Sequence, residues 1–103
     1  MMPAEVADAL AEAHPTLTGA ALDELAQNVD RACAAHVLYE LTGGREGFRP
    51  DGFRAALYVA MSKASPDHMA RIVAAFPDES LAYSVAHFVK GGRDAIRAAA
   101  RRG

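Results

Sequence analysis

Apolar residues recur three or four positions apart along most of this chain, a spacing that places side chains along one side of an α-helix. The longest such series consists of Leu22, Leu25, Val29, Cys33, Val37 and Leu41. Polar residues lie opposite this series, and Thr18 can cap the start of the helix. We therefore predict one long helix from Thr18 to about Thr42. The alternation of apolar and polar residues that is typical of strands is absent.

Turn and capping residues divide the rest of the chain into shorter helices. A first helix is predicted over residues 4–13, because the His-Pro pair that follows it ends the pattern. Two glycines then end the long helix. Residues 43–50 are predicted to be a loop in which Phe48 is an anchor.

Three further helices are predicted to follow one another through narrow turns. The first runs from a cap at Asp51 to about Ala64, and the third runs from Pro77 to about Val89. Between them, a serine, a proline and an aspartate at positions 65–67 form a strong helix start, and this helix runs to about Phe76. The residues expected to face inward are Phe53, Leu57, Ala60, Met61, Ala64, Met69, Ile72, Val73, Phe76, Leu81, Val85, Phe88 and Val89.

Together these elements predict an all-α fold, a compact single-domain bundle of five or six short-to-medium helices spanning residues 1–103. The basic tail, residues 93–103, is a sixth helix that is either docked or frayed, because an isolated helix of this length is marginal in water. The second and third helices are predicted to be central. Four apolar residues lie off their stripes and indicate either burial from several sides or an interface between copies: Leu38, Tyr39, Tyr58 and Val59.

The composition favours a small soluble domain. The chain has 103 residues, 51% of them hydrophobic, and a single cysteine, so an internal disulfide is excluded. The acidic N-terminus does not resemble a secretory signal, and no apolar run approaches the ~18 residues of a membrane span. We therefore expect a cytoplasmic protein without a membrane partner.

Candidate chemistry is sparse along the chain. The four histidines lack the spacing of metal ligands, and no serine, cysteine or glycine-rich loop stands in a catalytic or phosphate-binding motif. Cys33 lies on the apolar stripe, where packing is its expected role. His36 is expected to be partly buried and hydrogen-bonded. We therefore predict no enzyme activity, no metal and no cofactor.

Charge is distributed unevenly, although the net charge is only −2. Residues 1–30 contain six acidic residues and no lysine or arginine, whereas residues 90–103 contain five bases. Helical spacing predicts a basic strip with an aromatic residue at one end, formed by Tyr83, His87, Lys90, Arg93, Arg97 and Arg101. Such a strip fits an anionic partner, or it is simply a solvated helix face.

Residues 53–83 resemble small, mostly uncharacterised helical proteins of actinobacterial phages and prophages. The resemblance rests on Phe53, Ala56-Leu57, Lys63-Ala64, Arg71 and Ala75-Phe76-Pro77, with Tyr83 where a tryptophan is often expected. It implies a phage origin more than an activity.

The function predicted from the sequence is that of a small non-catalytic protein-binding or regulatory protein whose partner is another, acidic protein. Two alternatives stay open at this point. One is a nucleic-acid-binding accessory protein that uses the same bases, and the other is a structural or assembly protein in which the acidic N-terminal third and the basic tail pair between copies.

Overall fold

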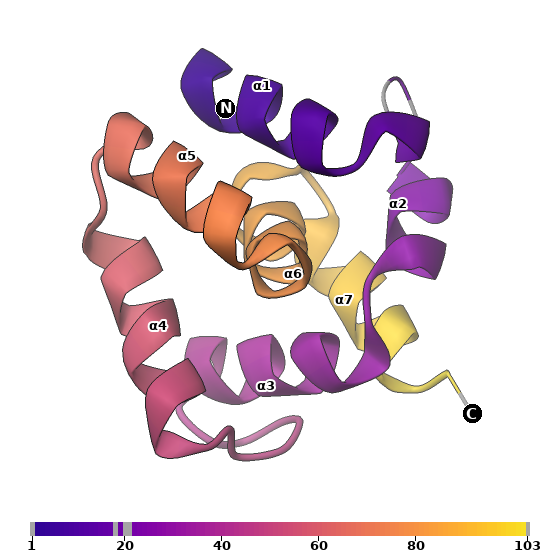
Figure 1. Ribbon diagram of the computed structural model, residues 1–103. Coiled ribbons are helices and arrows are strands. Elements are labelled where there is room, and N and C mark those ends of the chain that lie inside the picture. The colour runs from indigo at the N-terminus through magenta and orange to yellow at the C-terminus, as the bar shows by residue number, and fades with distance from the viewer. Residues whose placement is uncertain (1, 18, 20–21, 103) are drawn as a thin grey trace.

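A computed structural model describes residues 2–17, 19 and 22–102, with the backbone alone at positions 22 and 23. All regular secondary structure in the described residues is helical (Figure 1). They are α1 (Ala4–Ala13), the 3-10 turn η1 (Pro15–Leu17), α2 (Leu22–Asn28), α3 (Arg31–Leu41), α4 (Gly52–Lys63), α5 (Pro66–Ala75), α6 (Pro77–Phe88) and α7 (Gly92–Ala100). The predicted all-α class is confirmed, with seven α-helices in the described residues where five or six were expected.

Side-chain caps start α4 and α5 where the sequence predicted them. The Asp51 carboxylate accepts a hydrogen bond from the backbone N–H of Arg54 at 2.7 Å. The Ser65 hydroxyl accepts one from the N–H of His68 at 3.2 Å, and Pro66 occupies the first turn. These caps satisfy N–H groups that have no partner inside the helix.

The predicted long helix is wrong, because the chain breaks between α2 and α3. Asp30 has extended backbone angles and caps α3, its Oδ2 accepting a hydrogen bond from the Cys33 N–H at 3.0 Å. The apolar spacing continues through the break, since Val29 and Cys33 are both buried. Thr18, the expected cap, lies outside the described residues.

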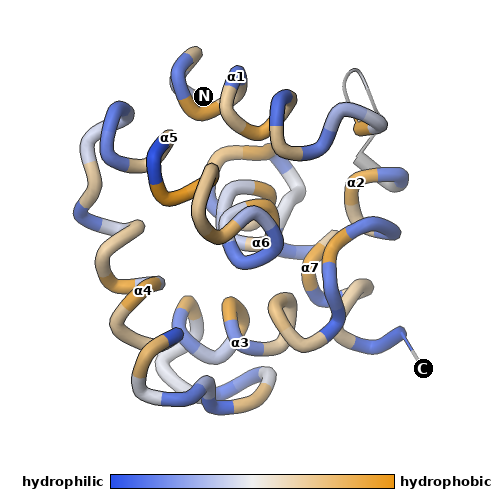
Figure 2. Tube along the Cα trace, viewed as in Figure 1, coloured by the Kyte–Doolittle hydropathy of each residue, from blue (hydrophilic) through white to orange (hydrophobic). Residues whose placement is uncertain are grey.

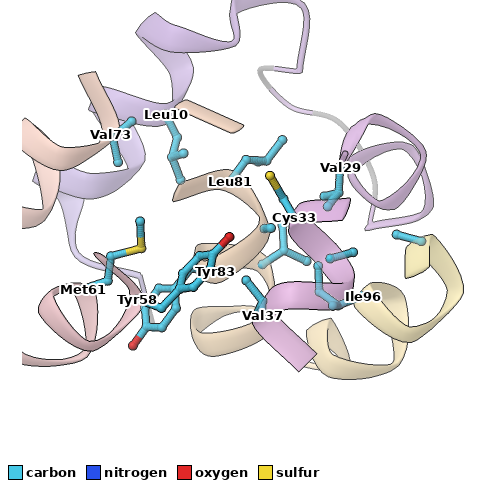
Figure 3. Close-up of a cluster of buried hydrophobic side chains, with 14 of the residues drawn as sticks. Leu10, Val29, Cys33, Val37, Tyr58, Met61, Val73, Leu81, Tyr83 and Ile96 are labelled. Carbon is cyan, nitrogen blue, oxygen red and sulfur yellow. The ribbon is translucent and has the colours of Figure 1, made fainter. Parts of the chain in front are cut away.

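The central element is α6, not the second and third predicted helices. Figure 1 shows α6 in the middle, seen nearly end-on and surrounded by the other helices. It packs against α1, α3, α4, α5 and α7, and every residue from Ser80 to Val85 is buried. Figure 3 shows Leu81 and Tyr83 of α6 within the core beside Leu10, Val37, Tyr58 and Ile96.

The inward face of α4 differs from the predicted one. Leu57, Tyr58 and Met61 are buried, whereas Phe53 is 60% exposed and Ala60 is also exposed. Tyr58 was placed off the stripe by the sequence. Because α4 carries apolar side chains on most of its sides, periodicity alone could not select the face that meets the core.

The basic tail is docked. Ile96 and Ala99 of α7 are buried, and α7 packs on α2, α3 and α6. Beyond the helix, the Arg102 guanidinium donates hydrogen bonds to the carbonyl oxygens of Ala26 (2.6 Å), Gln27 and Val29 (3.0 Å). These carbonyl groups lie at the C-terminal end of α2, where a positive charge interacts favourably with the helix dipole.

None of the helices formed by the described residues has both the length and the apolar character needed to cross a membrane.

Candidate functional site

Tyr83 does not belong to an exposed strip, as the sequence predicted. It is only 4% exposed, and its ring stacks on that of His87 with 5.2 Å between the ring centroids. Burial raises the pKa of its hydroxyl. The prediction failed because α6 is covered on most of its circumference, so the side opposite Leu81 and Val85 also meets other helices.

The loop between α3 and α4 lies directly against α3. The Phe48 N–H donates to the Ala35 carbonyl oxygen at 3.2 Å, and the Thr42 hydroxyl accepts from the Glu46 N–H at 3.0 Å. Gly47 has a φ of 76°, and a β-carbon at this position would collide with the Ala35 carbonyl. A glycine is therefore required for the loop to approach α3 this closely.

Arg97 of α7 holds the same loop from the other side. Its Nε and Nη2 donate to the two carboxylate oxygens of Glu46 at 2.8 and 3.1 Å, and its Nη1 donates to Asp94 at 2.7 Å. These hydrogen bonds lower the pKa of Glu46 and raise that of Arg97. The guanidinium is thus engaged by two carboxylates and does not act as a free cation.

An open groove of about 300 Å³ lies between α7 and the loop that joins α3 to α4, and we term it the loop–α7 groove. It is lined by Ala35, Leu38, Glu46, Gly47, Phe48, Arg97, Ala100 and Arg101. The Phe48 side chain is 69% exposed, so it is the backbone of this residue and not the predicted anchoring side chain that fixes the loop. Phe48 therefore supplies the exposed aromatic residue that was expected at Tyr83.

The bases predicted from the sequence separate into two sets. Arg97 and Arg101 line the groove, and Arg93 lies one helical turn before Arg97 on α7. The charges of all three lower the pKa of Glu46. Arg93 and Arg101 are exposed. His87 and Lys90 are exposed as well, but they do not line the groove.

Sequence reasoning missed the contribution of the loop. Arg45 and Arg49 flank Phe48 closely in sequence and are exposed. An aromatic residue set between two arginines and preceded by a glycine was the available signal, but nothing local indicates that this loop meets α7.

Several polar side chains of the described residues are buried in the core. Cys33 packs as predicted, and burial together with the neighbouring Asp30 carboxylate raises the pKa of its thiol to about 12, which keeps the thiol protonated. Burial also raises the pKa of Tyr58. His36 is half-buried as expected, but within the described residues its Nδ1 has no hydrogen-bond partner, and neither do the hydroxyls of Tyr58, Ser80 and Ser84.

An apolar hollow of about 390 Å³ lies between α1, α2 and α6 and is lined by residues that include Leu10, Leu25 and Leu81. The His14 Nε2 beside it is engaged by the Pro77 carbonyl oxygen at 3.0 Å. Among the described residues, no three His, Cys, Asp or Glu side chains converge as a metal site would require.

Comparison with known proteins gave no match, whether with family models, curated proteins or solved structures.

Proposed function

We propose that the protein is a small non-catalytic binding protein that captures an acidic partner protein through the loop–α7 groove. The observation that carries this proposal is the exposed ring of Phe48, held by a fixed backbone beside the exposed Arg101. Aromatic and arginine side chains contribute a large share of the binding energy at protein interfaces.

The groove combines features that suit an acidic protein segment. Leu38, Ala35 and Ala100 give it apolar walls, while Arg101 and the nearby Arg93 offer positive charge at its edge. An apolar side chain of the partner can pack on Phe48 while a neighbouring carboxylate pairs with Arg101. Because the contact between Arg97 and Glu46 already fixes the loop, little ordering entropy is lost on binding.

Nucleic acid fits this surface less well. Arg97 is neutralised by Glu46 and Asp94, and both acids lie among the remaining bases. The protein as a whole carries a net charge of −2. A polyanion gains most of its affinity from contacts between phosphates and cations, which these acids oppose.

To test the proposal, binding partners are captured on the immobilised protein and identified by mass spectrometry. The affinity of the purified partner is then measured by titration. We expect Phe48→Ala and Arg101→Glu each to weaken binding by about tenfold or more, since each alters a side chain that lines the groove. Thermal melts establish that both variants remain folded.

Lys90→Glu is the matched control, because it makes the same change of charge at an exposed base outside the groove. We expect Lys90→Glu to bind within about twofold of the wild type. Equal losses for Lys90→Glu and Arg101→Glu would count against the groove. Affinity for random duplex DNA that falls with salt and is lost in Arg101→Glu would replace this proposal with the nucleic-acid alternative.

A further inference from the structure

A small pocket lies between α3, α4 and α6, three helices that pack against one another. It has a volume of about 150 Å³, and its apolar walls are formed by Val37, Leu41, Tyr58 and Val59. Val59 is 47% exposed, whereas Val37 and Tyr58 are buried, so the pocket reaches from the surface into the core. Figure 2 shows mainly hydrophobic colouring along the middle of α4, and Figure 3 shows Val37 and Tyr58 within the core. These walls suit a short hydrocarbon chain.

The four off-stripe residues of the sequence analysis lie in different surroundings. Leu38 and Tyr58 are buried within the monomer, and Tyr39 is half-buried beside Gly44. Val59 alone is exposed. Tyr58 and Val59 are neighbours on α4 and both line the pocket, so it lies where the apolar surface of this helix passes from solvent into the core.

Three polar side chains line the same pocket: Glu40, Ser62 and Tyr83. Tyr83 is the most deeply buried of them. Burial alone raises the pKa of its hydroxyl, so no charge or hydrogen bond from the described residues acts on this group. Because buried polar groups nearly always have a hydrogen-bond partner, a hydroxyl without one in a pocket wall indicates a place for a polar atom of a ligand.

All three polar groups can accept hydrogen bonds. The Ser62 hydroxyl already donates its hydrogen to the Val59 carbonyl oxygen at 2.6 Å, so its free lone pairs can only accept. The Glu40 carboxylate accepts only and, within the described residues, forms no ion pair. Lys63 follows Ser62 but does not line the pocket. The site therefore carries a negative charge that calls for a cationic donor.

The aromatic wall favours the same kind of ligand. The Tyr58 hydroxyl lies near Cys33, which contributes to the raised pKa of Tyr58, so this residue offers the pocket its ring. A cation beside the face of a tyrosine ring is attracted by its electron density. Apolar walls, an aromatic ring and a carboxylate together favour an organic cation.

We propose that this pocket binds the ammonium group and short chain of a primary alkylamine. An ammonium group has three N–H donors, which matches the acceptors supplied by Glu40, Ser62 and Tyr83. A volume of about 150 Å³ corresponds to roughly five water molecules, which leaves room for about four carbons and the nitrogen. Such a group belongs to a free alkylamine or to a lysine side chain of a partner protein.

Titration with n-butylammonium chloride tests the proposal, with amide NMR shifts as the readout and sodium chloride lowered in step so that ionic strength stays constant. A ligand of so few atoms binds weakly, so we expect a Kd on the order of 5 mM. The largest shifts should lie around Leu41, Val59 and Tyr83. n-Butanol and n-butyrate, of the same chain length but neutral and anionic, should bind at least about fivefold more weakly.

Glu40→Gln should raise the Kd for butylammonium at least about fivefold, because it removes the negative charge of the pocket. Tyr83→Phe should raise it about two- to fivefold, because it removes one neutral acceptor. Glu24→Gln, which makes the same change at an exposed glutamate of α2 outside the pocket, should bind like the wild type. Thermal melts establish that the variants are folded.

Equal binding of butanol and butylammonium, an unchanged Kd in Glu40→Gln, or an equal loss in Glu24→Gln would overturn the proposal. The pocket shares no lining residue with the loop–α7 groove, so Arg101→Glu should bind butylammonium like the wild type. Failure of this proposal is therefore distinguishable from failure of the proposed function.

The methylamide of Nα-acetyl-lysine distinguishes the two sources of the ammonium group, because it carries the same group on a peptide backbone. A Kd equal to or below that of butylammonium would support the site and assign its ligand to a lysine side chain of a partner. A Kd about tenfold higher, with butylammonium still bound, would support the site and assign its ligand to a free alkylamine.

Discussion

Arg97 and Glu46 form the contact that joins the loop to α7, and its strength depends on pH. Arg97 donates two hydrogen bonds to the Glu46 carboxylate and holds the pKa of this group below its ordinary value. A carboxylate with a depressed folded-state pKa stabilises the folded protein above its unfolded pKa, and this stabilisation is lost as the pH falls through the folded pKa. We therefore expect the loop to loosen in acid.

Arg97→Gln should raise the pKa of Glu46 toward its ordinary value, because the hydrogen bonds from Arg97 are the largest cause of the shift. The measurement is an NMR titration of the Glu46 side-chain carboxyl carbon in both proteins. Arg93→Gln is the control and should raise the pKa less, since Arg93 acts on Glu46 only as a nearby charge. An unchanged Glu46 titration in Arg97→Gln would contradict the ion pair.

Which aromatic side chains are exposed could not be predicted from the sequence. Tyr83 is buried, while Phe48 and Phe53 are exposed, the reverse of what polarity and helical spacing suggested. The reason lies in contacts between segments of the fold. The helices around α6 cover Tyr83, whereas the loop that carries Phe48 is held to α3 by a backbone hydrogen bond to Ala35 and leaves the Phe48 ring exposed. Candidate residues on helical faces were therefore less reliable than the helices themselves.

At the level of elements, α7 meets α6 without room for a side chain at its first residue. A β-carbon on Gly92 would collide with the Val85 carbonyl of α6, whereas one on Gly52, the first residue of α4, would meet nothing within 4 Å. Gly92→Ala should destabilise the fold by about 1–3 kcal/mol, the usual cost of overpacking. Gly52→Ala, the matched control, should be neutral or slightly stabilising. Urea unfolding at low protein concentration measures both, and equal stabilities would show that α7 can shift without cost.

Helix starts were predictable where they depend on local chemistry. Asp51 and Ser65 cap helices within three residues of themselves, so their neighbours in sequence carry the whole signal. Asp30 caps α3 in the same way and could have been recognised, but the apolar series continues across it from Val29 to Cys33. The face of α4 was not predictable, because apolar residues on both sides of a helix leave its orientation to the rest of the fold.

At the scale of the whole molecule, the last predicted helices turned out to organise the fold. The chain places α6 at the centre, and α7 closes the bundle by packing on α2, α3 and α6. The sequence contained the apolar residues of α6 but not this arrangement, which depends on contacts between segments far apart in the chain, such as that of Arg102 with the end of α2.

Arg101 and Arg102 are neighbours of the same type with opposite expected roles, which makes them a stringent test of this arrangement. Arg102 donates to three carbonyls at the end of α2, so Arg102→Ala should lower the free energy of unfolding by roughly 0.5–1.5 kcal/mol and speed amide exchange in α7. Arg101→Ala should change stability by less than about 0.5 kcal/mol. Partner binding should show the reverse order, because Arg101 lines the loop–α7 groove and Arg102 does not. Equal effects of the two substitutions on stability would mean that Arg102 does not hold the tail. Equal effects on partner binding would mean that the groove is not the binding surface.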